Sequence, residues 1–134
     1  NNGDDEYNND KIVEIQNLEL QKGKVYLIVF WTSWCELTCH KINMCYQSSW
    51  KENVKFIGMS IQESLDKCNE TIKDKNWENI EFYLDKDNTN FSKYGLNKVP
   101  RIILIDKEGN VCKNGIFDSE SKLINTINLM LNNI

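Results

Sequence analysis

Hydrophobic positions fall in blocks of two different periods along the chain, and these periods predict strands and helices in turn. The continuous β-branched and aromatic run at 25–31 is typical of a strand buried on both faces, and 54–61 repeats the pattern. Between the two runs, apolar residues recur at helical spacing from residue 36 onward; they are Leu37, Ile42, Cys45, Tyr46 and Trp50. The order strand, helix, strand predicts one parallel βαβ unit.

The same periodicities predict the remaining elements. An edge strand is predicted at 12–15, an amphipathic helix at 64–77 on Leu65, Cys68 and Ile72, a strand at 80–84, and a small helix through Phe91 and Tyr94. A strand at 102–105, a hairpin turn at 107–110 and a returning strand from Val111 follow. A last helix is capped by Asp118 or Ser119, and its buried side carries Leu123, Ile127, Met130 and Leu131. We therefore predict an α/β domain with a central mixed sheet, parallel first and antiparallel last, flanked by helices and extended by an N-terminal strand or hairpin.

Composition limits the number of domains and the classes of partner. A chain of 134 residues that is 40% hydrophobic supports one core, so we predict a single domain at 11–134 after a loose, acidic, asparagine-rich tail at 1–10. The net charge of −4 gives no electrostatic footprint for nucleic acid or an anionic membrane. No apolar run approaches the roughly 20 residues that span a bilayer. The chain begins with Asn1 rather than methionine, which is consistent with a processed fragment whose targeting segment is missing.

The cysteines differ in what their positions predict. Cys35 directly follows a buried strand and opens a helix, where free backbone N–H groups and the helix dipole stabilise a thiolate, the reactive form. Cys39 lies one turn further on the same helix face, about 6 Å away along the axis, within reach of a strained and labile disulfide. We expect Cys45, Cys68 and Cys112 to be inert, because they fall on apolar faces of regular elements.

Two segments carry a family resemblance. Residues 30–35, Phe-Trp-Thr-Ser-Trp-Cys, are similar to the strand end and the tryptophan-cysteine start of the active site in thioredoxin-like proteins. Residues 94–100, Tyr-Gly-Leu-Asn-Lys-Val-Pro, followed by 102–109, Ile-Ile-Leu-Ile-Asp-Lys-Glu-Gly, resemble the second signature of the same proteins, and the resemblance covers about 12–131. The closest branches are the TlpA/ResA type and the tryparedoxin and nucleoredoxin type. The resemblance implies a thioredoxin fold, a cis peptide bond before Pro100, and a thiol–disulfide oxidoreductase with Cys35 as nucleophile and Cys39 as resolving thiol.

The same resemblance implies the surroundings of the thiol pair. Substrate-binding residues are expected at Trp34, Val99, Pro100 and Arg101, and possible modulators at Glu36, Thr38 and His40. The expected partners are a protein or peptide disulfide and a dithiol reductant. We expect a monomer without a metal or a cofactor beyond the cysteine pair. No compartment follows from the residues, and the resemblance leans toward a non-cytosolic one.

This sequence departs from the family pattern in the cysteine spacing and at two further positions, 29 and 101. Three residues separate the cysteines where the family has two, so either Thr38 or Cys39 occupies the resolving position; the helical pattern favours Cys39. Val29 stands where many relatives carry a buried acidic or amide residue that assists proton transfer. Val29 therefore supplies no proton relay. Arg101 follows the proline where a small or hydroxylated residue is common, so we expect it to screen the cysteines or to bind an acidic partner.

Three other functions remain as alternatives. A redox-inactive, thioredoxin-like binding module fits the altered spacing. A Sco-like copper protein fits a pair of soft thiolates three residues apart, but His40 lies beside Cys39 rather than near Pro100, where those proteins take their histidine. A peroxidase would use Thr32 and Arg101, and the tryptophans and Pro100 argue against it.

Overall fold

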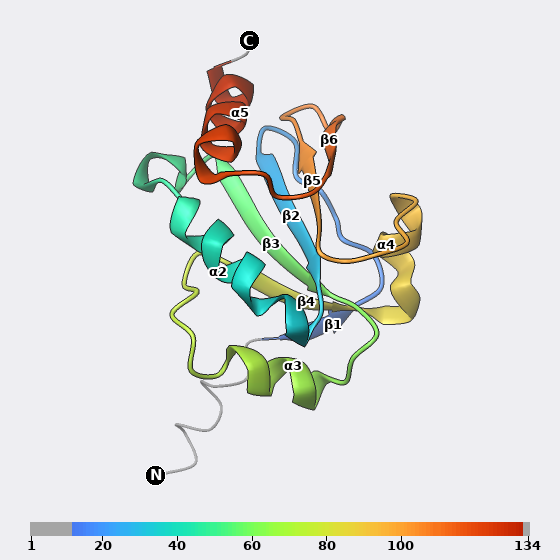
Figure 1. The fold of residues 1–134 in the computed structure, drawn as a ribbon. Coiled ribbons are helices and arrows are strands. Elements are labelled where there is room, and N and C mark those ends of the chain that lie inside the picture. Colours follow the sequence, from blue (N-terminus) through green and yellow to red (C-terminus); the bar gives the residue numbers. More distant parts are fainter. Residues whose placement is uncertain (1–11, 133–134) are drawn as a thin grey trace.

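The computed structural model describes residues 12–132, so the predicted tail at 1–10 lies outside the described part. Its six-stranded sheet has the order β1-β4-β3-β2-β5-β6 (Figure 1). The strands are β1 (Val13–Ile15), β2 (Val25–Trp31), β3 (Val54–Ser60), β4 (Glu81–Asp85), β5 (Arg101–Ile105) and β6 (Val111–Gly115). The helices are α2 (Glu36–Cys45), α3 (Leu65–Ile72), α4 (Thr89–Lys93) and α5 (Glu120–Asn132).

Strand directions confirm the predicted change from parallel to antiparallel pairing. β2 pairs parallel with β3 along its whole length, from Val25 opposite Val54 to Trp31 opposite Ser60, with α2 as the crossover. β5 runs antiparallel to β2 and β6 antiparallel to β5. β1 adds to the far edge parallel to β4, so the N-terminal addition is a strand rather than a hairpin.

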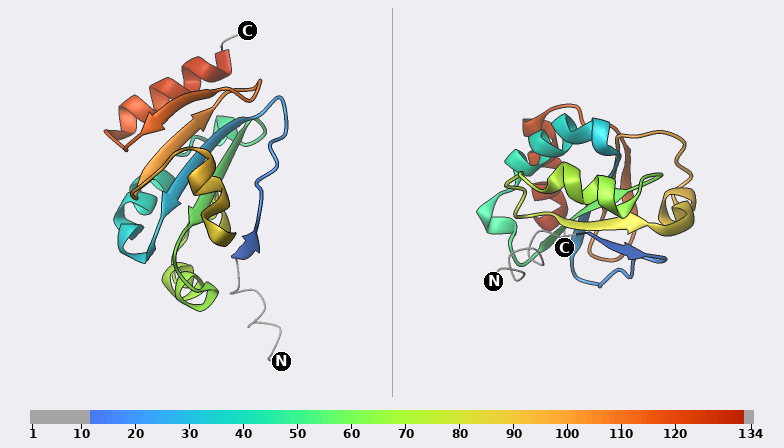
Figure 2. Two further views of the ribbon diagram at one scale, coloured as in Figure 1. Left: turned by 90° about the vertical axis from the view of Figure 1, so that its right-hand side faces the viewer. Right: turned by 90° about the horizontal axis from the view of Figure 1, so that it is seen from below.

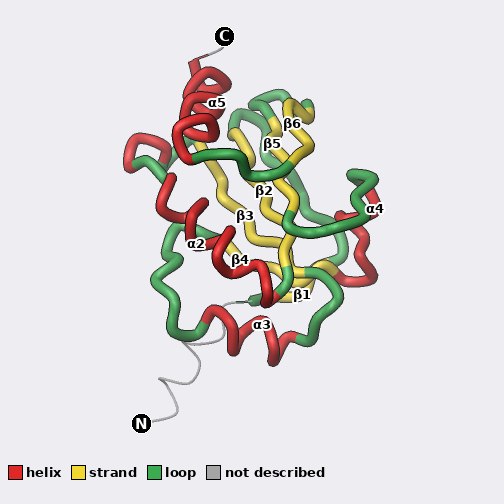
Figure 3. The backbone as a smooth tube through the Cα atoms, in the orientation of Figure 1, coloured by secondary structure: helices red, strands yellow, loops and turns green. Residues whose placement is uncertain are grey.

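Helices cover both faces of this sheet, as Figures 1 and 2 show and the colours of Figure 3 make clear. On one face, α2, α3 and α5 contribute residues such as Ile42, Ile72 and Ile127 to one core cluster with alternate residues of the strands, and α2 and α5 contact β2 directly. On the other face, α4 packs through Phe91 against alternate residues of β2 and β5. A strand covered on both sides must be apolar throughout, and all seven residues of β2 are buried.

The helix predicted from residue 36 to Trp50 is shorter than expected. It ends at Cys45, because Tyr46 turns to extended backbone, and Trp50 is buried from a separate 3-10 turn, Ser48–Trp50. Its indole Nε1 donates to Asn128 Oδ1 of α5 at 2.8 Å. Leu37 was expected on the core side and is 64% exposed, so that assignment was wrong.

The helix predicted at 64–77 is likewise shorter than expected. A serine caps the start of this helix, and another serine caps the start of the last helix. α3 ends at Ile72, and Leu65, expected on its buried side, is exposed. Ser64 Oγ accepts the Lys67 N–H at its start. Of the two proposed caps of the last helix, Ser119 acts, because its Oγ accepts the Lys122 N–H at 3.2 Å.

Candidate functional site

Cys35 lies between the end of the central strand β2 and the start of α2. A 3-10 turn, Ser33–Cys35, connects the two elements, and the Cys35 N–H donates to the Thr32 carbonyl at 2.9 Å. Cys35 is therefore the residue that precedes the first turn of α2, at the positive end of the helix dipole. Its side chain is a free thiol that is only 4% exposed.

One hydroxyl lies within hydrogen-bonding reach of the Cys35 sulfur. Thr32 Oγ1 is 3.7 Å from Cys35 Sγ, and both residues are buried. A hydroxyl can donate to a thiolate or accept from a thiol, so this contact suits either protonation state of the sulfur. Sequence reasoning gave Thr32 a role only in the peroxidase alternative, whereas the structure places it directly against the sulfur.

Cys39 lies on the buried side of α2 as a neutral thiol. It is a free cysteine, 2% exposed. Burial raises the pKa of Cys39 far above its ordinary value, and the charges of Cys35 and Glu36 raise it further, against a smaller lowering by its own backbone N–H. The Glu36 carboxylate at the helix start is paired with Lys75 Nζ at 2.9 Å. The Cys39 thiol therefore keeps its proton in the reduced chain.

Glu63 is a residue of this site that sequence reasoning missed. It lies in the connection between β3 and α3, and its carboxylate accepts two bonds from Ser33, from the backbone N–H at 2.8 Å and from Oγ at 2.6 Å. The connection is itself held in place, since the Ile61 N–H donates to the Trp31 carbonyl at 3.1 Å. Glu63 thus fixes the turn that carries Cys35 from 30 residues away, a distance at which no local pattern signals it.

The loop before β5 reaches the same end of the sheet as Cys35. Arg101 pairs with Phe30 near the end of β2, so Val99 and Pro100 lie beside the turn that follows that strand. The Val99–Pro100 peptide bond is cis, and both residues are partly exposed. Trp34, next to Cys35, is 72% exposed. Three of the four residues expected to bind substrate, Trp34, Val99 and Pro100, thus lie at one end of the sheet with part of their surface free.

The remaining expected site residues have partners of their own. Arg101 Nε donates to Asn114 Oδ1 on β6 at 3.2 Å, which directs this side chain along the sheet edge. His40 Nδ1 accepts from Trp77 Nε1 at 3.5 Å, so the histidine is tied to the connection before β4. Thr38 is partly buried on α2, and its side chain makes no hydrogen bond to another residue within 12–132.

The three cysteines expected to be inert differ in burial. Cys45 and Cys68 are fully buried, and burial raises the pKa of Cys45 to about 11. Cys68 Sγ lies 3.0 Å from Ser60 Oγ and 3.8 Å from Glu63 Oε1. Cys112 is exposed, which corrects the expectation of an apolar environment, because β6 is the edge strand and its alternate residues lack a covering helix.

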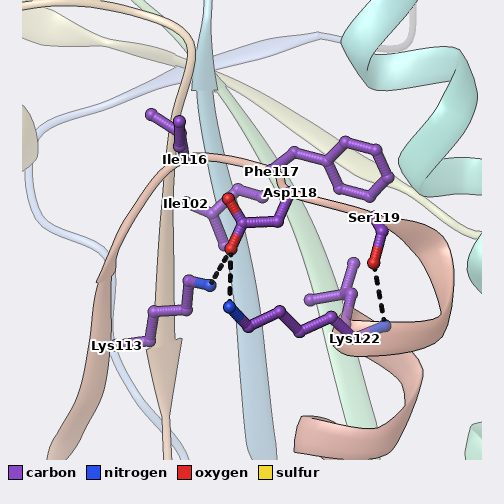
Figure 4. Close-up of a pocket in the computed structure, with 8 residues that line it drawn as sticks. Ile102, Lys113, Ile116, Phe117, Asp118, Ser119 and Lys122 are labelled. Carbon is purple, nitrogen blue, oxygen red and sulfur yellow. Dashed lines mark hydrogen bonds and ion pairs between the residues drawn. The ribbon is translucent and has the colours of Figure 1, made fainter.

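Residues 12–132 contain neither a cluster of metal-ligating side chains nor a membrane-spanning helix. No group of three or more His, Cys, Asp or Glu side chains in this range is arranged to hold a metal ion, and no helix in it is long and apolar enough to cross a membrane. The hollow between β5, β6 and α5 in Figure 4 has a volume of about 10 Å³, room for one water at most. There Asp118 binds Lys113 and Lys122, as the dashed lines show.

Comparison with solved structures shows the thioredoxin fold. The thioredoxin domain of a thiol-disulfide oxidoreductase from Bacteroides vulgatus matches with a TM-score of 0.67 and 24% identity, covering 83% of this chain and 81% of that one. StoA from Bacillus subtilis matches with 0.67 and 20%, covering 78% and 83%. A secreted Mycobacterium tuberculosis disulfide oxidoreductase homologous to DsbE matches with 0.66 and 18%, covering 81% and 83%.

The family itself is shown by the sequence. No curated protein sequence matches this chain significantly. A family described as thioredoxin-like matches residues 23–111, which is more than half of the chain and includes both the Cys35 segment and the Pro100 loop. The chain belongs to the thioredoxin-like family.

Proposed function

We propose that this chain is a thiol–disulfide oxidoreductase of the TlpA/ResA or tryparedoxin type, with Cys35 as nucleophile and Cys39 as resolving thiol. The observation that carries the proposal is a pair of free thiols, one at the start of α2 and one on its buried side, beside the loop of Val99 and Pro100. The match to the thioredoxin-like family covers both parts of this site. Fold alone would not carry the proposal, since thioredoxin-like domains serve several functions.

The proposed reaction proceeds in two exchange steps. The Cys35 thiolate attacks one sulfur of a substrate disulfide, an S–S bond forms between Cys35 and that sulfur, and the other substrate sulfur leaves as a thiolate. Cys39 then loses its proton and attacks Cys35, and the second substrate sulfur leaves. The substrate gains two electrons and two protons and becomes a dithiol, and the chain holds a Cys35–Cys39 disulfide. An external dithiol then reduces the Cys35–Cys39 disulfide to two thiols and is itself oxidised to a disulfide.

Deprotonation of Cys39 is the demanding step in this scheme. Burial keeps the pKa of Cys39 high, and the charge of Cys35 adds to it. Formation of the mixed disulfide removes that charge, so the pKa of Cys39 falls when it must react. The substrate thiolate released in the first step is the base that this scheme supplies for the Cys39 proton. Val29, where a relay carboxylate would lie, is buried and apolar and offers no alternative.

Substrate binding is proposed for the exposed surface around the pair. A polypeptide that presents a disulfide to Cys35 must approach past Trp34, which is largely exposed, and past the partly exposed Val99 and Pro100. Arg101, held toward β6 by Asn114, contributes positive charge at the border of this surface. Glu36 and His40 modulate the pair from the first turns of α2.

Reduction of insulin disulfides by dithiothreitol tests the proposal. The wild-type chain should accelerate the reaction, and Cys35→Ser should abolish the acceleration. Cys112→Ser is the matched control, because Cys112 is also free but lies exposed on β6, and it should keep full activity. Unchanged activity in Cys35→Ser would refute the assignment.

A binding module without turnover is the second candidate, and the burial of both thiols favours it. Cys35 is 4% exposed and Cys39 2%, which limits the access of a substrate disulfide to either sulfur, and the raised pKa of Cys39 slows the second exchange step in addition. Single-turnover measurements with an excess of substrate disulfide separate the two functions. An oxidoreductase forms a mixed disulfide and then releases a dithiol, whereas a module binds and forms neither.

A further inference from the structure

The outer face of α2 and the turn before it carries a stripe of exposed apolar side chains. Trp34 is 72% exposed, Leu37 64% and Met44 62%. Single exposed apolar residues are ordinary on protein surfaces, but a contiguous group marks an interaction site. We call Trp34, Leu37, Lys41 and Met44 the α2 stripe.

The stripe lies on the solvent side of α2, beside the face by which α2 packs on the sheet. Leu37, Lys41 and Met44 follow one another at steps of four and three residues, which places them on one side of the helix, and Trp34 lies three residues before Leu37 in the 3-10 turn that precedes it. The buried residues of the same helix, Cys39, Ile42 and Cys45, form the adjacent packing face. An ordinary surface helix is polar on its outer face. Alternating steps of three and four are the spacing by which one helix packs along another.

The middle of the α2 stripe carries a positive charge, that of Lys41. Lys41 is exposed and makes no ion pair within residues 12–132. Glu36, at the beginning of α2, is already neutralised by Lys75 at 2.9 Å. The stripe therefore presents apolar side chains around one uncompensated positive charge on a chain whose net charge is −4. A partner that buries it must supply apolar groups and a carboxylate.

We propose that the α2 stripe is the docking surface for an amphipathic helix of a partner protein, with apolar residues on Trp34, Leu37 and Met44 and a carboxylate opposite Lys41. This inference rests on the proposed function for the identity of the partner, a protein that exchanges disulfides with Cys35. Because the stripe begins at the residue before Cys35, a helix docked along it brings a neighbouring cysteine of the partner close to the nucleophile. Docking raises the effective concentration of that cysteine.

Fluorescence anisotropy with synthetic helical peptides tests the docking surface. The probe is a labelled amphipathic peptide without cysteine that carries leucines at the same alternating spacing and one central glutamate. Two comparison peptides replace the leucines by serine or the glutamate by lysine. We expect the leucine–glutamate peptide to bind wild type and Met44→Ser to weaken it about tenfold. Leu129→Ser, a matched control 72% exposed on α5, should bind as wild type does.

Lys41→Glu gives a readout that a loss of folding cannot imitate. This variant should prefer the peptide with lysine over the peptide with glutamate, whereas wild type has the opposite preference. Equal binding of all peptides, or an unchanged preference in Lys41→Glu, overturns the proposal. Self-association of the wild type that Met44→Ser abolishes also overturns it, because a second copy then covers the stripe.

The peptide-binding experiment tests the docking surface independently of the proposed function. The peptides contain no cysteine, so their binding does not depend on thiol chemistry at Cys35. A wild-type chain that does not accelerate insulin reduction would refute the oxidoreductase and leave peptide docking measurable. Conversely, if the wild-type chain reduces insulin but binds none of the peptides, the docking proposal is refuted and the proposed function stands.

Discussion

Replacing Glu63 by alanine removes both bonds that hold Ser33 in the turn before α2. The carboxylate accepts from the Ser33 N–H at 2.8 Å and from Ser33 Oγ at 2.6 Å. A hydrogen bond to a charged group contributes about 1.5–3 kcal/mol. Glu63 is partly exposed, so water replaces part of the loss, and we expect a decrease of about 2 kcal/mol in the free energy of unfolding. That is a large share of a stability of about 5–15 kcal/mol.

Urea unfolding followed by tryptophan fluorescence measures this loss. With a denaturant slope of about 2 kcal/mol per molar, the midpoint should fall by about 1 M. Glu70→Ala is the matched control, because Glu70 is exposed and makes only a surface ion pair with Lys67 at 3.9 Å. The control should cost less than about 0.5 kcal/mol.

A double-mutant cycle assigns the effect to the contact itself. Ser33→Ala removes the hydroxyl bond and keeps the backbone one, so we expect a coupling of about 1 kcal/mol with Glu63→Ala. If Glu63→Ala destabilised no more than Glu70→Ala, the argument that Glu63 holds the Cys35 turn would be refuted.

Two further predictions concern the core and a surface ion pair. A Cβ on Gly58 would lie 2.8 Å from two ring carbons of Phe82 and 3.1 Å from Ile80 Cγ2, so Gly58→Ala should cost about 1–3 kcal/mol; an unchanged thermal midpoint would contradict this. The hydrogen bond and charge of Lys122 lower the pKa of Asp118, so its stabilisation is present above the unfolded pKa of about 3.9 and lost as the pH falls through the folded value. Asp118→Asn should therefore lose less stability on acidification below about pH 4; equal acid slopes would count against the pair.

The sheet could be predicted closely because its strands have a strong and simple pattern. Residues 25–31 form β2 with the predicted bounds, since a strand covered on both faces has to be apolar at every position. Helix faces were less certain. Leu37 is apolar and exposed, and only its angle around α2, away from the buried face of Cys39 and Ile42, distinguishes it from a core residue.

The site was predictable where it depends on neighbours in the sequence and not where it depends on distant ones. Cys35 lies at the junction that the strand and helix patterns predict. Glu63 contacts that junction from the next crossover, and an acidic residue in a loop carries no signal of its partner. Cys112 was expected on an apolar face of its strand, but the sequence does not reveal that β6 is the edge strand.

The central claim is that Cys35 is the nucleophile and Cys39 the thiol that resolves its adduct. Reaction of reduced Cys39→Ser with oxidised insulin, followed by peptide mass spectrometry, tests it most directly. The account predicts a stable adduct of one insulin chain linked through Cys35, and no lasting adduct with the wild type, where Cys39 releases it. No adduct with Cys39→Ser, or one attached at Cys45, Cys68 or Cys112, would contradict the account.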